Sequence, residues 1–136
     1  FMTNDPYIIL QFEKGGALRA KLELEKAPET TAAILAALPL ETIAKQARTG
    51  GAEIYCETAH LIKGLGPENL TPAAFGSVQF ACEPYNNIVF YYDTMLASPP
   101  FNAFATVAED DIAELKKIGY RLWEQGFEKV TVIKGE

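Results

Sequence analysis

Alternation of apolar and polar residues at the start of the chain predicts a β-hairpin. Between residues 7 and 25, two apolar-rich runs flank Gly15-Gly16, and a glycine pair tolerates the positive φ of a tight hairpin turn. The second run has a period of two, which predicts a strand with one buried and one solvated face. The residues expected on its buried face are Leu18, Ala20, Leu22 and Leu24.

The segment 27–39 has the features of a helix. It opens with Pro28, whose fixed φ suits the first helical turn, and Glu29 follows where the helix dipole favours a negative charge. Ile34, Leu35 and Leu38 form its apolar face, and Pro39 ends it.

A second helix is expected between residues 110 and 126. We expect Asp110 or Asp111 to cap its start and Gly126 to end it. Its apolar face repeats at helical spacing and consists of Ile112, Leu115, Ile118, Leu122 and Trp123.

The rest of the chain reads as short strands. Residues 40–48 fit both a helical and an extended pattern, and we favour the extended one. Runs rich in β-branched and aromatic residues, separated by Gly, Pro and Asn, predict further strands within 52–62, 76–84, 87–94, 98–109 and 128–135. Without an internal repeat or linker, residues 3–135 are expected to form a single domain. The fold class is therefore mainly β, and a barrel is the simplest way to hide the edges of so many strands.

Composition and charge exclude some classes of binding partner. The formal net charge is -6 with no cluster of Lys and Arg, which argues against nucleic acid or membrane as a partner, since phosphate binding needs concentrated positive charge. Cys56 and Cys82 lie in strand-like apolar stretches without metal-binding spacing, so we expect reduced, buried thiols in a cytoplasmic protein. His60 is the only histidine, and we expect neither a metal nor a cofactor.

The order of these elements resembles the cyclophilins. Pro28 and Thr30 stand at the Pro-x-Thr start of the family's first helix, and Phe104 and Val107 match its Phe-Gly-x-Val strand, with Ala105 in place of the glycine. The shortened middle and the "ARTGGAEIY" passage are similar to small prokaryotic cyclophilin-like proteins of unknown function, close to the DUF3830 family. The resemblance implies a closed eight-stranded antiparallel barrel with a helix covering each open end.

Most of the residues that cyclophilins use for prolyl isomerisation are missing from this chain. Arg48 takes the place of the family's arginine and Tyr91 that of its floor phenylalanine, but no Phe-Met-x-Gln-Gly motif follows Arg48. The family's tryptophan and histidine are absent from "MLASPPFNA", and Glu53 and Glu57 add negative charge. We therefore expect a binding protein without isomerase activity.

The predicted ligand is a small molecule or a short peptide. The ligand-binding residues are expected to be Arg48 and Glu53 as polar anchors, Tyr55, Tyr91 and Phe101 as apolar walls, and Asn102 as a two-way hydrogen bonder.

Several alternatives stay open at this point. Arg48 and Glu53 could form only a rim ion pair, and such exposed pairs contribute little. The chain could be a weak isomerase that uses Arg48 alone, or a hydrolase or lyase with Glu53 as general base, although no nucleophile is evident. A structural homo-oligomer is the third class, in which Phe90, Tyr91 and Tyr92 would form the core of a homodimer interface.

Overall fold

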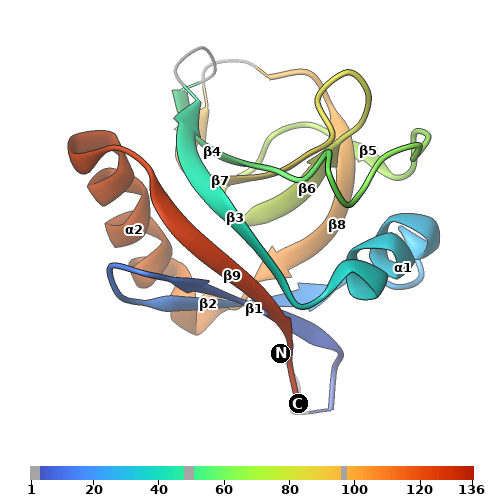
Figure 1. Cartoon of the computed structure of the whole chain (residues 1–136), viewed down its shortest axis with the longest axis horizontal. Coiled ribbons are helices and arrows are strands. Elements are labelled where there is room, and N and C mark those ends of the chain that lie inside the picture. Colours follow the sequence, from blue (N-terminus) through green and yellow to red (C-terminus); the bar gives the residue numbers. More distant parts are fainter. Residues whose placement is uncertain (1–3, 48–50, 96–97) are drawn as a thin grey trace.

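The computed structural model describes residues 4–47, 51–95 and 98–136, and within them the strands form one antiparallel sheet (Figure 1). Its neighbours follow the order β2-β1-β9-β3-β4-β7-β6-β8, and pairing of β2 with β8 closes the sheet into an eight-stranded barrel. The two-residue strand β5 pairs with the start of β8. The strands are β1 (Tyr7–Phe12), β2 (Ala17–Leu22), β3 (Leu40–Ala47), β4 (Gly51–Glu57), β5 (Leu70–Thr71), β6 (Ser77–Ala81), β7 (Asn87–Met95), β8 (Phe101–Val107) and β9 (Glu128–Lys134). The predicted fold class is confirmed.

The first hairpin turns at the predicted glycines. Gly15 and Gly16 have φ angles of 114° and 92°, a backbone region that other residues rarely adopt. Leu18, Ala20 and Leu22 are buried as predicted, but the chain leaves the sheet after Leu22. Leu24 is 43% exposed, so its predicted place on the buried face is wrong.

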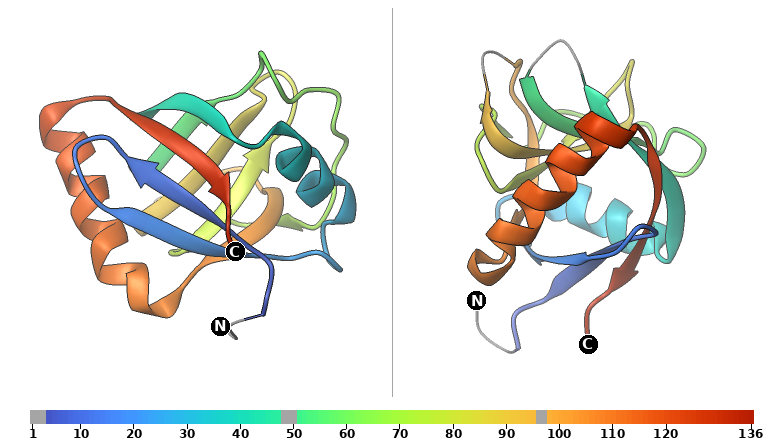
Figure 2. Two further views of the ribbon diagram at one scale, coloured as in Figure 1. Left: turned by 60° about the horizontal axis from the view of Figure 1, so that its bottom comes forward. Right: turned by 90° about the vertical axis from the view of Figure 1, so that its left-hand side faces the viewer.

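The two helices cover opposite ends of the barrel, as the two views of Figure 2 show. Helix α1 (Pro28–Ala37) contributes Ile34 to the barrel core, and helix α2 (Ile112–Gln125) contributes Leu115, Ile118 and Leu122. None of the helices in the described ranges combines the length and the apolar content that crossing a membrane requires.

The start of α2 differs from the expected cap. The Asp111 carboxylate does not cap the helix but accepts hydrogen bonds from Arg19, at 2.8 Å from its backbone nitrogen and 3.0 Å from Nε. This carboxylate therefore joins the helix to β2. At the other end, Gly126 ends the helix with a φ of 88°, as predicted.

The expected strand within 52–62 is shorter than the sequence suggested. Strand β4 ends at Glu57 because the backbone N–H and the hydroxyl of Thr58 both donate to the carbonyl of Asn86, after which Ile62 turns back to donate to the Thr58 carbonyl. The cysteines differ as well. Cys56 is buried on β4, whereas Cys82 lies in the turn after β6 and is only half-buried, and both are free thiols.

Candidate ligand-binding site

Consecutive aromatic residues of β7 face opposite sides of the barrel wall. Phe90 and Tyr92 belong to the main core inside the barrel, whereas Tyr91 packs with Ala81 and Val89 in a separate cluster. Side chains alternate along a strand, so this second cluster lies on the outer face of β4, β6, β7 and β8.

Four of the predicted site residues meet on this outer face. Tyr55 and Phe101 pack against the cluster around Tyr91, and Glu53 stands directly opposite Tyr91 in the register of β4 and β7. We call this group the outer-face cluster: Glu53, Tyr55, Ala81, Val89, Tyr91 and Phe101. Their roles in binding stay a prediction.

A short hydrogen-bond chain fixes Tyr91 in this cluster. Its hydroxyl donates to Oε1 of Gln79 at 3.3 Å, and Nε2 of Gln79 donates to the Pro72 carbonyl at 3.2 Å. Burial raises the pKa of Tyr91 to about 12, so the phenol is neutral at physiological pH. Tyr91 is thus a fully buried, neutral side chain with a fixed hydroxyl group.

Glu53 is the acidic group of the cluster, and its carboxylate oxygens are not among the fully buried polar atoms that lack a partner in the described residues. Only 9% of its surface is exposed, and burial raises its pKa above the ordinary 4.5 because it disfavours the charged form. Across residues 4–47, 51–95 and 98–136, no hydrogen bond or ion pair reaches its carboxylate. A buried carboxylate without a partner is costly to stability.

Asn102 lies elsewhere, although it follows Phe101 directly. It is fully buried, and Nδ2 donates to Thr30 Oγ1 at 3.2 Å and to the Gly66 carbonyl at 2.9 Å. Its Oδ1 accepts from the Glu68 backbone N–H at 3.0 Å. Asn102 is a two-way hydrogen bonder, but it connects β8 to α1 and to the loop before β5 instead of lining the outer-face cluster.

Arg48 lies outside the described residues, so its predicted role as a polar anchor stays untested, as does the alternative of a rim ion pair with Glu53. His60 is exposed in the turn after β4. In the described part of the chain, no group of three or more His, Cys, Asp and Glu side chains is placed to hold a metal ion.

The aromatic residues proposed for a homodimer interface are used inside the chain. Phe90 and Tyr91 are fully buried, and Tyr92 is only 3% exposed. A dimer would therefore need a different surface.

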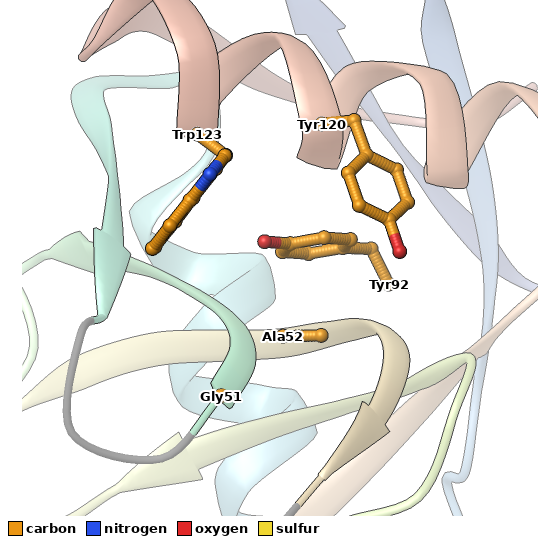
Figure 3. A pocket seen from close by; sticks show the side chains of 5 residues that line it. All are labelled: Gly51, Ala52, Tyr92, Tyr120 and Trp123. Atoms are coloured by element: carbon orange, nitrogen blue, oxygen red, sulfur yellow. The ribbon is translucent and has the colours of Figure 1, made fainter.

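A cavity at the α2 end of the barrel was not predicted from the sequence. It has a volume of about 230 Å³ and is lined by Gly51, Ala52, Tyr92, Tyr120 and Trp123 (Figure 3). Trp123 was expected on the buried face of α2, but it is 53% exposed, and Tyr120 is 47% exposed. The available signal was their spacing of three residues, which places both rings side by side on one helix.

The closed antiparallel barrel with a helix at each end is the architecture that the resemblance to the cyclophilins implied. The chain belongs to the DUF3830 family, whose description is "Protein of unknown function". The family model matches residues 11–133. A comparison with curated proteins finds no match.

Solved structures that share this fold include the following two. The structure of McbB in complex with tryptophan is 17% identical with a TM-score of 0.77, over 93% of this chain and 44% of McbB. The solution structure of the hypothetical protein AF2241 from Archaeoglobus fulgidus is 23% identical with a TM-score of 0.65, over 98% of this chain and all of AF2241. The chain thus spans less than half the length of McbB. At these identities the likeness shows the fold alone.

Proposed function

We propose that this protein binds a small molecule or a short peptide at the outer-face cluster. The observation that carries the proposal is Glu53, a nearly buried carboxyl group without a hydrogen-bond partner among the described residues, set in an apolar surrounding. Burying such a group lowers stability, and a ligand that donates hydrogen bonds to it would offset this cost.

The surroundings of Glu53 indicate the chemistry of the ligand. Its polar part is a donor such as an ammonium group or an N–H, because an ionised carboxylate only accepts hydrogen bonds. Its apolar part lies against the half-buried rings of Tyr55 and Phe101. The exposed ring of Tyr85 extends this surface, with its edge toward Phe101 and a centroid distance of 6.4 Å.

The tryptophan in the McbB structure has both of these parts, an aromatic ring and an ammonium group. Because McbB is only 17% identical to this chain, its ligand is not transferred here. It supports the choice of aromatic amines as the first compounds to test.

Prolyl isomerisation is not part of the proposed function. The reaction forms no covalent intermediate, so catalysis depends on positioning a donor at the prolyl nitrogen and on electrostatic complementarity. The Phe-Met-x-Gln-Gly floor is missing, and Glu53 is an acceptor next to Tyr91. We expect no acceleration of isomerisation in a coupled peptide assay. A rate increase that Arg48→Ala removes would contradict this expectation.

The binding proposal is tested by thermal shift with matched pairs of compounds. Tryptamine is compared with the neutral 3-ethylindole, and short peptides with their N-acetylated forms. Compounds that bind only the native state raise the melting temperature, and we expect the charged member of a pair to raise it more.

Two variants locate the binding. Glu53→Gln should abolish the preference for the charged member. Glu57→Gln should keep it, because Glu57 lies two residues along β4 and is exposed, with its carboxylate 2.8 Å from Lys45 Nζ. Equal shifts in both variants, or no shift with any compound, would overturn the proposal.

A further inference from the structure

The outer side of helix α2 exposes aromatic side chains to solvent. Tyr120 and Trp123 lie about one helical turn apart and are 47% and 53% exposed. Phe127, two residues beyond the end of the helix, is 67% exposed. In the right-hand view of Figure 2, α2 lies at the front, across the end of the barrel. Aromatic residues are enriched at protein–protein interfaces, so this side of the helix is a candidate contact surface.

The helix that carries this surface is held firmly against the barrel. Its inner side packs into the core. Gly119 lets α2 approach Tyr92 closely, since a Cβ atom at Gly119 would lie 2.1 Å from Tyr92 Cγ. The Tyr120 ring packs edge-on against Tyr92 with centroids 5.3 Å apart, and its hydroxyl donates to Asp93 Oδ2. The surface is therefore preformed, and little ordering is lost when a partner binds to it.

Two opposite charges flank Tyr120 on this side of the helix. Lys117 precedes Tyr120 by three residues and Glu124 follows it by four, so the three side chains share one helix face. Both charged side chains are exposed, and neither forms an ion pair or a hydrogen bond with another residue of the ranges 4–47, 51–95 and 98–136. They are about 10 Å apart along the helix axis, too far to pair with each other. Each charge is therefore available to a partner molecule.

The spacing of these charges is self-complementary. When two such helices pack antiparallel about a two-fold axis next to Tyr120, each residue meets the residue that lies equally far beyond the axis on the second copy. Lys117 of one copy then comes opposite Glu124 of the second copy, and this pair forms twice. Phe127 comes opposite the first turn of the second helix, where Ala113 is small and exposed. One contact thus covers the aromatic rings and pairs both charges.

We propose that the face of α2 formed by Lys117, Tyr120, Trp123, Glu124 and Phe127 is a homodimer interface, which binds the same face of a second copy of this chain. A contact made of one helix face from each copy is at the small end of specific interfaces, so the dimer should dissociate at micromolar concentrations. The interface does not include the outer-face cluster, so this proposal is independent of the proposed function.

Sedimentation equilibrium tests the proposal from low micromolar to millimolar protein concentration. The mean mass should rise with concentration from 14.9 kDa toward twice this value. Over the same range the emission of Trp123, the only tryptophan of the chain, should shift to shorter wavelength, because dimerisation buries its exposed surface. A mass that stays monomeric, or one that rises without this shift, would overturn the proposal.

Charge reversal tests the antiparallel pairing. Lys117→Glu or Glu124→Lys alone places like charges opposite each other, and we expect each change to weaken association about fivefold or more. A mixture of the two variants should associate at least as tightly as the wild type, because each contact between the different variants joins opposite charges. A mixture that associates no better than the separate variants would contradict the pairing.

Matched variants control for the change in net charge. Lys63→Glu and Glu25→Lys alter the net charge in the same way, but they lie in exposed loops outside α2 and should associate like the wild type. Phe127→Ser removes an exposed ring from the interface and should weaken association about tenfold. Circular dichroism verifies that each variant is folded. Equal losses in the controls and in the α2 variants, or wild-type association of folded Phe127→Ser, would overturn the proposal.

Discussion

The inner and outer faces of the same strands, β4 and β7, differ in what they bury. The inner face buries hydrocarbon, such as Ile54 and Phe90, in one continuous core that also receives both helices. The outer face buries Glu53 and the phenol of Tyr91. Apolar burial stabilises the fold, whereas a buried carboxylate without a partner lowers stability. The inner face therefore stabilises the fold, whereas the outer face buries a carboxyl group at a cost in stability.

Truncation of the inner face should have the largest effect. Phe90 is fully buried and its ring contacts Phe12 edge-on with centroids 6.3 Å apart. Phe90→Ala is expected to lower the free energy of unfolding by about 3–5 kcal/mol, because it removes apolar burial and leaves a cavity. Chemical denaturation measures this loss. A decrease below about 1 kcal/mol would contradict the structural role given to the inner face.

Asn102 differs from Glu53, because it is a buried polar residue whose side-chain nitrogen and oxygen both have hydrogen-bond partners. Asn102→Ala would leave the Glu68 N–H and the Gly66 carbonyl without their partner. We expect a loss of about 2 kcal/mol in the free energy of unfolding, because each unpaired buried group carries a desolvation penalty. The Glu68 carboxylate also accepts from the backbone N–H groups of Glu29 and Thr30, so the start of α1 should show faster amide exchange in this variant. Unchanged exchange there would contradict the assigned connection.

For Glu53 we predict the opposite effect: its replacement should raise the free energy of unfolding. Its folded pKa is raised above the ordinary 4.5, so the folded protein holds the proton more tightly than the unfolded chain. The free energy of unfolding therefore falls as pH rises above 4.5, and the loss is complete above the folded pKa.

Glu53→Gln should remove this loss and stabilise the protein by about 0.5 kcal/mol at pH 8, with little effect at pH 4. Denaturation curves at the two pH values measure the difference. The exposed Glu57→Gln serves as control and should change stability by less than about 0.5 kcal/mol at either pH. Destabilisation by Glu53→Gln at pH 8 would show that the carboxylate has a partner in the folded protein.

The sequence predicted the barrel because periodicity and turn residues are local signals. Residues 40–47 are extended as favoured, and Pro28 and Gly126 mark the ends of helices as expected. Leu24 was misplaced because the alternation continues after Leu22, where β2 ends. Trp123 was misplaced because it lies outside the buried face of α2, although it directly follows the buried Leu122. Which side of a helix faces the barrel depends on tertiary contacts, such as that of Gly119 with Tyr92, which no local pattern contains.

Only part of the candidate site was predicted, because only its local features can be read from the sequence. Alternation along a strand places Glu53 and Tyr55 on one face, but the register that brings Tyr91 and Phe101 to that face is a long-range property. Phe101 and Asn102 were assigned to one pocket although neighbouring strand residues point to opposite sides. The cavity at Tyr92 was missed because it joins β7 to a helix that follows much later in the sequence.

The central claim is that the Glu53 carboxylate accepts a hydrogen bond from a ligand. The most direct test is to measure the pKa of Glu53 with carbon-detected NMR. In the free protein we predict a pKa above 4.5, because burial disfavours the charged form. Saturation with tryptamine should lower this pKa, since an ammonium donor favours the charged form. The Tyr120→Leu variant serves to exclude an effect from the cavity at the α2 end. A Glu53 pKa at or below 4.5 in the free protein, or one that no amine changes, would contradict the claim.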